Sequence, residues 1–93
     1  MMIDQTERRF RRIGSLIYEV SMHPNTSEPW ETTSKRNKIF MTAAVDSCIN
    51  DYKNDEDFSP DRCLGIISQA ALGQLNPKMV MEVIAERWNS KDE

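Results

Sequence analysis

Apolar residues recur at spacings of three and four along most of this 93-residue sequence, and this periodicity constrains the fold more than any other feature. Positions three, four and seven apart share one face of an α-helix, so each periodic segment can bury one side against a core. Glycine occurs only at Gly14, Gly65 and Gly73, and no Asn-Gly or Asp-Gly pair favours a β-hairpin. The pattern predicts an all-α chain.

Capping signals divide the chain into four expected helices with short connections. Each expected start carries a side chain that can accept hydrogen bonds from the amides of the first turn. These N-cap residues are Asp4, Ser27, Ser59 and Asn76. Pro60 and Pro77 occupy the first helical position of the last two helices, and His23 before Pro24 ends the first helix. The expected helices cover residues 5–22, 28–53, 60–74 and 77–89, and residues 90–93 are expected to fray.

Each expected helix has an apolar side that predicts its buried face. The inward residues are Phe10, Ile13, Leu16, Ile17 and Val20 in the first helix, Cys63, Leu64, Ile67, Ala70 and Ala71 in the third, and Val80, Met81, Ile84 and Trp88 in the fourth. The second helix leaves only a thin polar stripe, so we expect it at the centre of the bundle. The order is up-down-up-down if the last two helices form a hairpin at Leu75-Asn76, and a steep crossing is the alternative.

Length and composition predict a single helical domain over residues 1–93. Hydrophobic residues make up 39% of the chain and charged residues 29%, which is ordinary for a globular protein. No apolar run approaches the roughly 20 residues of a membrane-spanning helix. The first residues lack the basic and apolar segments of a secretory signal, so we expect a cytoplasmic protein that has no contact with membranes.

The sequence offers no arrangement of residues for catalysis or for a cofactor. His23, the only histidine, lies at an expected helix end, where the helix dipole favours a cation. Cys48 and Cys63 have the spacing of core residues, although a thiol pair between two helices is an alternative. The acidic segment 51–57 lacks the glycine and the glutamate of a calcium loop, and no glycine-rich phosphate motif is present. We expect a protein that is not an enzyme and holds no metal or cofactor.

Two basic clusters are the most conspicuous polar features. Arg8, Arg11 and Arg12 project away from the apolar face of the first helix and are candidate partner contacts. They are consistent with a solvated face, an acidic protein partner or nucleic acid. Lys35, Arg36 and Lys38 form a second candidate contact at the start of the second helix. If the two helices are antiparallel, this cluster lies at the opposite end from the arginines, so one continuous phosphate track is not expected.

Trp30 and Trp88 are candidate anchors of a protein interface, because aromatic side chains near helix ends either cap a core or contact a partner. The third and fourth helices around Gly73 also invite a helix-turn-helix interpretation. However, the second of them would expose Glu82 and Glu86 toward phosphates, which is unfavourable. The overall charge of −3 argues in the same direction.

A short acidic helical chain without catalytic motifs resembles the small accessory proteins of phages and mobile elements, anti-CRISPRs and inhibitors of host enzymes among them. This resemblance covers size and composition, and it implies a viral protein that binds and inhibits or adapts a host protein complex. The alternative is a small DNA- or RNA-binding regulator that uses one of the basic clusters. A homodimer that packs through the small residues Gly65, Ala70 and Gly73 is compatible with either interpretation.

Overall fold

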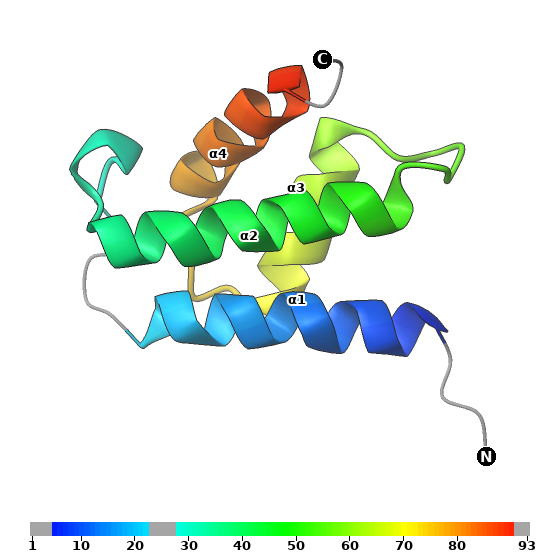
Figure 1. The fold of residues 1–93 in the computed structure, drawn as a ribbon, viewed down its shortest axis with the longest axis horizontal. Coiled ribbons are helices and arrows are strands. Elements are labelled where there is room, and N and C mark those ends of the chain that lie inside the picture. The colour runs from blue at the N-terminus through cyan, green and yellow to red at the C-terminus, as the bar shows by residue number, and fades with distance from the viewer. Residues whose placement is uncertain (1–4, 23–27, 91–93) are drawn as a thin grey trace.

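The computed structural model describes residues 5–22 and 28–90 (Figure 1). These residues contain four α-helices, one short 3-10 helix and no strand. The elements are α1 (Gln5–Ser21), η2 (Trp30–Thr32), α2 (Lys35–Tyr52), α3 (Pro60–Ala70) and α4 (Pro77–Ser90). The predicted all-α bundle is therefore confirmed.

The helices pack as an antiparallel pair crossed by a third helix. Figure 1 shows α1 and α2 side by side and running in opposite directions, so the start of α1 lies beside the end of α2. α3 runs across both of them, and α4 packs against α2 and α3. Because α3 lies across α1 and α2 rather than alongside them, the four helices do not form the up-down-up-down order that was one expectation (Figure 1).

The hydrophobic core lies around α2. This agrees with the central position that the sequence predicted for the helix from its narrow polar stripe. α2 packs against α1, α3 and α4, which explains why its apolar residues wrap so much of its circumference. The buried apolar side chains are Ile13, Ile17 and Val20 of α1, Met41, Ala44, Val45, Cys48, Ile49 and Tyr52 of α2, Cys63 and Ile67 of α3, Ala71 and Leu75 of the following turn, and Met79, Val80, Val83 and Ile84 of α4.

Some residues expected to face inward lie at the edge of this core. They are half-buried rather than buried: Phe10, Leu16, Leu64, Ala70, Met81 and Trp88. Glu82 was expected on the outer face of α4, and it is half-buried with its Oε2 shielded from solvent. Because α4 packs against two helices and η2, its buried surface is broader than the one face that the sequence predicted.

The second helix begins later than predicted, at Lys35 instead of residue 28. Ser34 is the N-cap, and its hydroxyl accepts a hydrogen bond from the Asn37 amide at 3.3 Å. Before it, Thr33 donates its hydroxyl proton to the Pro29 carbonyl at 3.0 Å, at the end of the 3-10 turn. Hydroxyl side chains that bond nearby backbone compete with helix formation, which explains the delayed start. The proposed caps Asp4 and Ser27, and His23, lie outside the described residues.

The starts of the last two helices follow the sequence prediction. The Ser59 hydroxyl accepts from the Arg62 amide at 3.2 Å, and Pro60 occupies the first position of α3. Asn76 Oδ1 accepts from the Lys78 amide at 2.9 Å and begins α4 in the same way. Both caps satisfy amides that a helix leaves unpaired at its first turn.

The end of α3 comes at Ala70, four residues before the predicted end. The Leu72 amide donates to the Gln69 carbonyl and the Gly73 amide to the Ser68 carbonyl, both at 3.1 Å. This pair of bonds is a Schellman motif, which requires a left-handed residue after the helix. Leu72 has a φ of +54° and Gly73 a φ of +74°, so the chain turns left-handed at a leucine as well as at the glycine.

Candidate partner-binding surface

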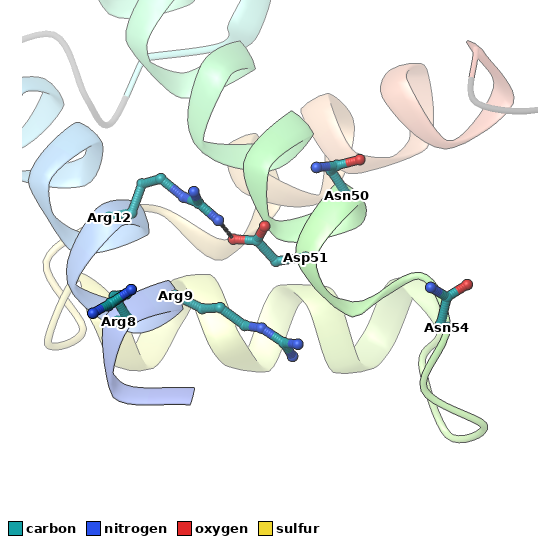
Figure 2. Close-up of a pocket in the computed structure, with 6 residues that line it drawn as sticks. All are labelled: Arg8, Arg9, Arg12, Asn50, Asp51 and Asn54. Atoms are coloured by element: carbon teal, nitrogen blue, oxygen red, sulfur yellow. Dashed lines mark hydrogen bonds and ion pairs between the residues drawn. The ribbon is translucent and has the colours of Figure 1, made fainter. Parts of the chain in front are cut away.

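The antiparallel pairing of α1 and α2 gathers a polar pocket at the start of α1. Its volume is about 380 Å³, and its lining residues are Arg8, Arg9 and Arg12 of α1 with Asn50, Asp51 and Asn54 at the end of α2 (Figure 2). The spacing of the three arginines along α1 turns them toward the end of α2. The sequence predicted the arginines as a contact but gave no reason to place the asparagines beside them.

Positive charge dominates this pocket. Arg12 forms an ion pair with Asp51, whose side chain is only 9% exposed. The Arg9 guanidinium lies 5.2 Å from the centre of the Tyr52 ring, a cation–π distance. Arg8 is exposed. The pocket is therefore lined by three guanidinium groups and one carboxylate, and the asparagine amides add neutral donors and acceptors. Such a pocket is suited to an anionic group, which arginine can bind through two parallel hydrogen bonds.

Arg11 lies outside this pocket, on the exposed outer face of α1. The exposed side chains of α1 and of Met22 just after it follow the spacing of one helical face: Arg8, Arg11, Arg12, Ser15, Tyr18 and Met22. The predicted exposure of Arg8, Arg11 and Arg12 is confirmed.

The second basic cluster lies at the other end of the helix pair and is largely engaged within the chain. Arg36 forms an ion pair with Glu19 near the end of α1, at 3.3 Å. Lys38 Nζ donates to the Glu31 carbonyl at 3.3 Å and lies 5.6 Å from the centre of the Trp30 ring. Lys35 is exposed. The expected separation of the two clusters is confirmed, since one lies beside the start of α1 and the other beside its end.

Both tryptophans are half-buried and pack against the core. Trp30 donates its indole proton to Glu86 Oε2 at 3.0 Å, which fixes η2 to α4. The ring centroid of Trp88 lies 5.2 Å from that of Phe58, which stacks in turn on Tyr52 at 6.0 Å. These contacts give each tryptophan a structural role, and a role in a partner interface stays a prediction.

Sequence reasoning missed a group of exposed apolar side chains. Tyr18, Met22, Ile39 and Leu72 are large, apolar and exposed, and Leu72 is the most exposed of them. Tyr18 and Leu72 line a hollow of about 310 Å³ between α1 and the turn after α3, together with the small residues Gly14, Ser21 and Ala70. Spacing could have revealed Tyr18 and Met22, because they continue the outer face of Arg11. Leu72 carried no signal, because the sequence placed it inside a helix.

The cysteines are unsuited to nucleophilic chemistry. Cys48 and Cys63 are free thiols buried in the core. A hydrogen bond with the Cys63 thiol, and then burial, raise the pKa of Cys48 far above its ordinary value, so the thiol stays neutral. Among the described residues, no group of histidine, cysteine, aspartate or glutamate side chains is arranged to hold a metal ion. None of the helices in that part of the chain has the length and apolar character to cross a membrane.

The chemistry that the lining of the arginine pocket is suited to is the recognition of an anionic group. Comparisons with other proteins add no family to this picture. No protein-family model matches the sequence, and comparisons with curated proteins and with solved structures return no similar chain.

Proposed function

We propose that this chain is a non-enzymatic protein-binding module of the cytoplasm that recognises an acidic segment of another protein. In the form that its size and composition suggest, it is a phage or mobile-element protein that inhibits or adapts a host complex. The observation that supports this proposal is the pocket of Arg8, Arg9 and Arg12, whose lining contains three guanidinium groups and the single carboxylate of Asp51.

Stability alone does not account for this arginine cluster. Arg8 lies four residues from Arg12, and like charges at this spacing destabilise a helix by about 0.2–0.5 kcal/mol. Asp51 compensates Arg12 directly, whereas Arg8 lies exposed at the mouth of the pocket. A carboxylate supplied by a partner would relieve the repulsion, which favours a binding role for these side chains.

A protein partner fits the charge distribution better than nucleic acid does. Nucleic-acid binding normally uses several cations that follow a phosphate backbone. Here Arg36 and Lys38 lie at the far end of the helix pair, where Glu19 and the Glu31 carbonyl engage them. The chain as a whole carries a charge of −3. A single cluster in an acidic protein suits a short acidic segment, and a DNA- or RNA-binding regulator is the competing outcome of the test.

The test is an affinity pull-down of the tagged protein from a bacterial lysate, with and without nuclease, read by mass spectrometry. We expect one stoichiometric protein that survives nuclease and is lost from the double variant Arg8→Ala/Arg9→Ala, which removes two of the three arginines that line the pocket. The matched control is Lys35→Ala, an exposed cation of the second cluster that should leave recovery unchanged. Circular dichroism and urea unfolding should show that the double variant remains folded.

Two results would contradict the proposal. If nuclease removes the bound material and affinity falls with salt on a log-log slope of about −0.9 per phosphate contacted, the chain binds nucleic acid. If the partner is retained by the arginine double variant and lost from Lys35→Ala, the contact lies at the second cluster instead.

A further inference from the structure

A leucine occupies the position after α3 where a Schellman motif normally has glycine. The bond from the Leu72 amide to the Gln69 carbonyl and that from the Gly73 amide to the Ser68 carbonyl identify Leu72 as the first residue beyond the helix cap. Its φ of +54° brings its Cβ close to the following carbonyl, a steric cost that glycine does not have. Glycine would therefore serve the fold better at this position.

Packing does not offset this strain. The Leu72 side chain is 82% exposed, so it contributes almost no buried apolar area to the folded chain. A non-glycine residue held in the left-handed region is a recognised sign of a functional position. Leu72 thus combines two features that are unfavourable for an isolated domain, a strained backbone and an apolar side chain in water.

Leu72 lines a hollow together with another exposed apolar residue. Tyr18 of α1, 62% exposed, lines the same 310 Å³ hollow, and the side chains of Gly14, Ser21 and Ala70 that border it are small or absent. This volume is large enough for one apolar side chain of a partner. Both exposed residues can then contact that side chain.

The hollow is continuous with the basic surface along α1. Arg11, Ser15, Tyr18 and Met22 are exposed at spacings of three and four residues, so they share one helical face. From Arg8 to Met22 this face extends about 21 Å, at 1.5 Å per residue. It is basic at its first end, and at its second end it carries Tyr18 and Met22 beside Leu72.

We infer that the outer face of α1, with Leu72, docks a protein segment that carries carboxylates at one end and a large apolar side chain at the other, the apolar group lying between Tyr18 and Leu72. This inference rests on the proposed function and deepens it, because it defines the sequence pattern of the bound segment. The charge of the arginines determines which end of the segment is acidic. The length of the face matches an amphipathic helix of about four turns.

The first part of the test measures the strain at Leu72. In Leu72→Gly the backbone cost disappears, so the urea midpoint should equal or exceed that of the wild type. Leu72→Ala retains a Cβ in the left-handed region while it removes the apolar side chain, and it is the matched control for strain. A lower midpoint for Leu72→Gly than for Leu72→Ala would show that a Cβ at this position carries no net backbone cost, and this would overturn the inference.

The second part measures recognition with a displayed library of random peptides selected on the wild-type protein. We expect enriched peptides that combine acidic residues with a leucine, phenylalanine or tryptophan. Their dissociation constants should rise at least about tenfold on both Leu72→Ala and Leu72→Gly, the loss expected when a large apolar contact is removed. The double variant Arg8→Ala/Arg11→Ala should weaken the same peptides independently.

The outcomes separate this inference from the proposed function. Peptides that lose affinity for the arginine variant but bind both Leu72 variants as tightly as the wild type would overturn the inference and leave the proposed function standing. The absence of any enriched acidic-apolar peptide would also overturn it. So would a dimer of the wild type that dissociates in Leu72→Ala, because a second copy of the chain would then be the occupant.

Discussion

Replacement of Asn37 by leucine is expected to stabilise the protein. Asn37 lies in the first turn of α2 with no exposed surface, and neither its Oδ1 nor its Nδ2 has a hydrogen-bond partner among the described residues. A buried amide without partners costs about 1–3 kcal/mol. The substitution does not affect the backbone amide of residue 37, which donates to the Ser34 hydroxyl, because leucine retains that bond.

The expected change in the free energy of unfolding is the sum of two stabilising contributions and one destabilising contribution. Leucine removes the unpaired amide and adds about 1.5–3 kcal/mol for a fully buried aliphatic side chain. The extra volume costs about 1–3 kcal/mol where the surrounding side chains must shift. The net gain is about 1–3 kcal/mol in the free energy of unfolding. For a domain of this size each kcal/mol corresponds to about 4–8 °C in the melting temperature.

Urea unfolding followed by circular dichroism measures this gain, with thermal unfolding as a second assay. The m-value should stay unchanged, because the variant alters stability and not the surface exposed on unfolding. Asn37→Asp is the matched control of nearly equal shape, and it should be strongly destabilising because it buries a charge. A loss of more than about 1 kcal/mol in Asn37→Leu would refute the reasoning, since it would mean that the folded protein needs the amide.

Three further predictions concern the core, a helix cap and the thiols. Ile67→Ala should lower the free energy of unfolding by about 2–5 kcal/mol, because Ile67 is fully buried; a loss below about 0.5 kcal/mol in urea unfolding would contradict the packing described. Ser59→Ala should cost about 1 kcal/mol through loss of the bond to the Arg62 amide, and an unchanged urea midpoint would argue against that cap. Because the Cys63 hydrogen bond and burial raise the pKa of Cys48 above its ordinary value of 9.0, only the unfolded chain releases this proton as the pH rises. Stability should therefore be unaffected by this group below pH 9.0 and fall above it, and Cys48→Ala should flatten the decline in urea midpoints measured up to about pH 10.

The helical class and two helix starts could be predicted because they depend on local chemistry. Ser59 with Pro60, and Asn76 with Pro77, act on the amides of their own first turn, so neighbouring residues suffice to identify them. The start of α2 at Lys35 was missed because several hydroxyl residues precede it, and the sequence does not show that Thr33 bonds the Pro29 carbonyl while Ser34 caps the helix.

The candidate site was predictable only in part, for a similar reason. The arginines were visible as a cluster, whereas Asn50 and Asn54 join them only through the antiparallel packing of α1 and α2. Leu72 lies outside a helix because α3 ends at Ala70, about one helical turn before the end that the sequence predicted. In the sequence, Gly73 alone marked a left-handed residue, and the hydrogen bonds that place Leu72 one step before it are a property of the folded turn.

The stacked aromatic residues connect the arginine pocket to the last helix. Arg9 lies over Tyr52, Tyr52 stacks on Phe58, and Phe58 contacts Trp88 near the end of α4. An anion that draws Arg9 away from the Tyr52 ring changes the first contact of this series, and the indole stands at its other end. Because Trp30→Phe would leave Trp88 as the single tryptophan, its fluorescence emission offers a direct way to measure whether occupancy of the pocket reaches α4.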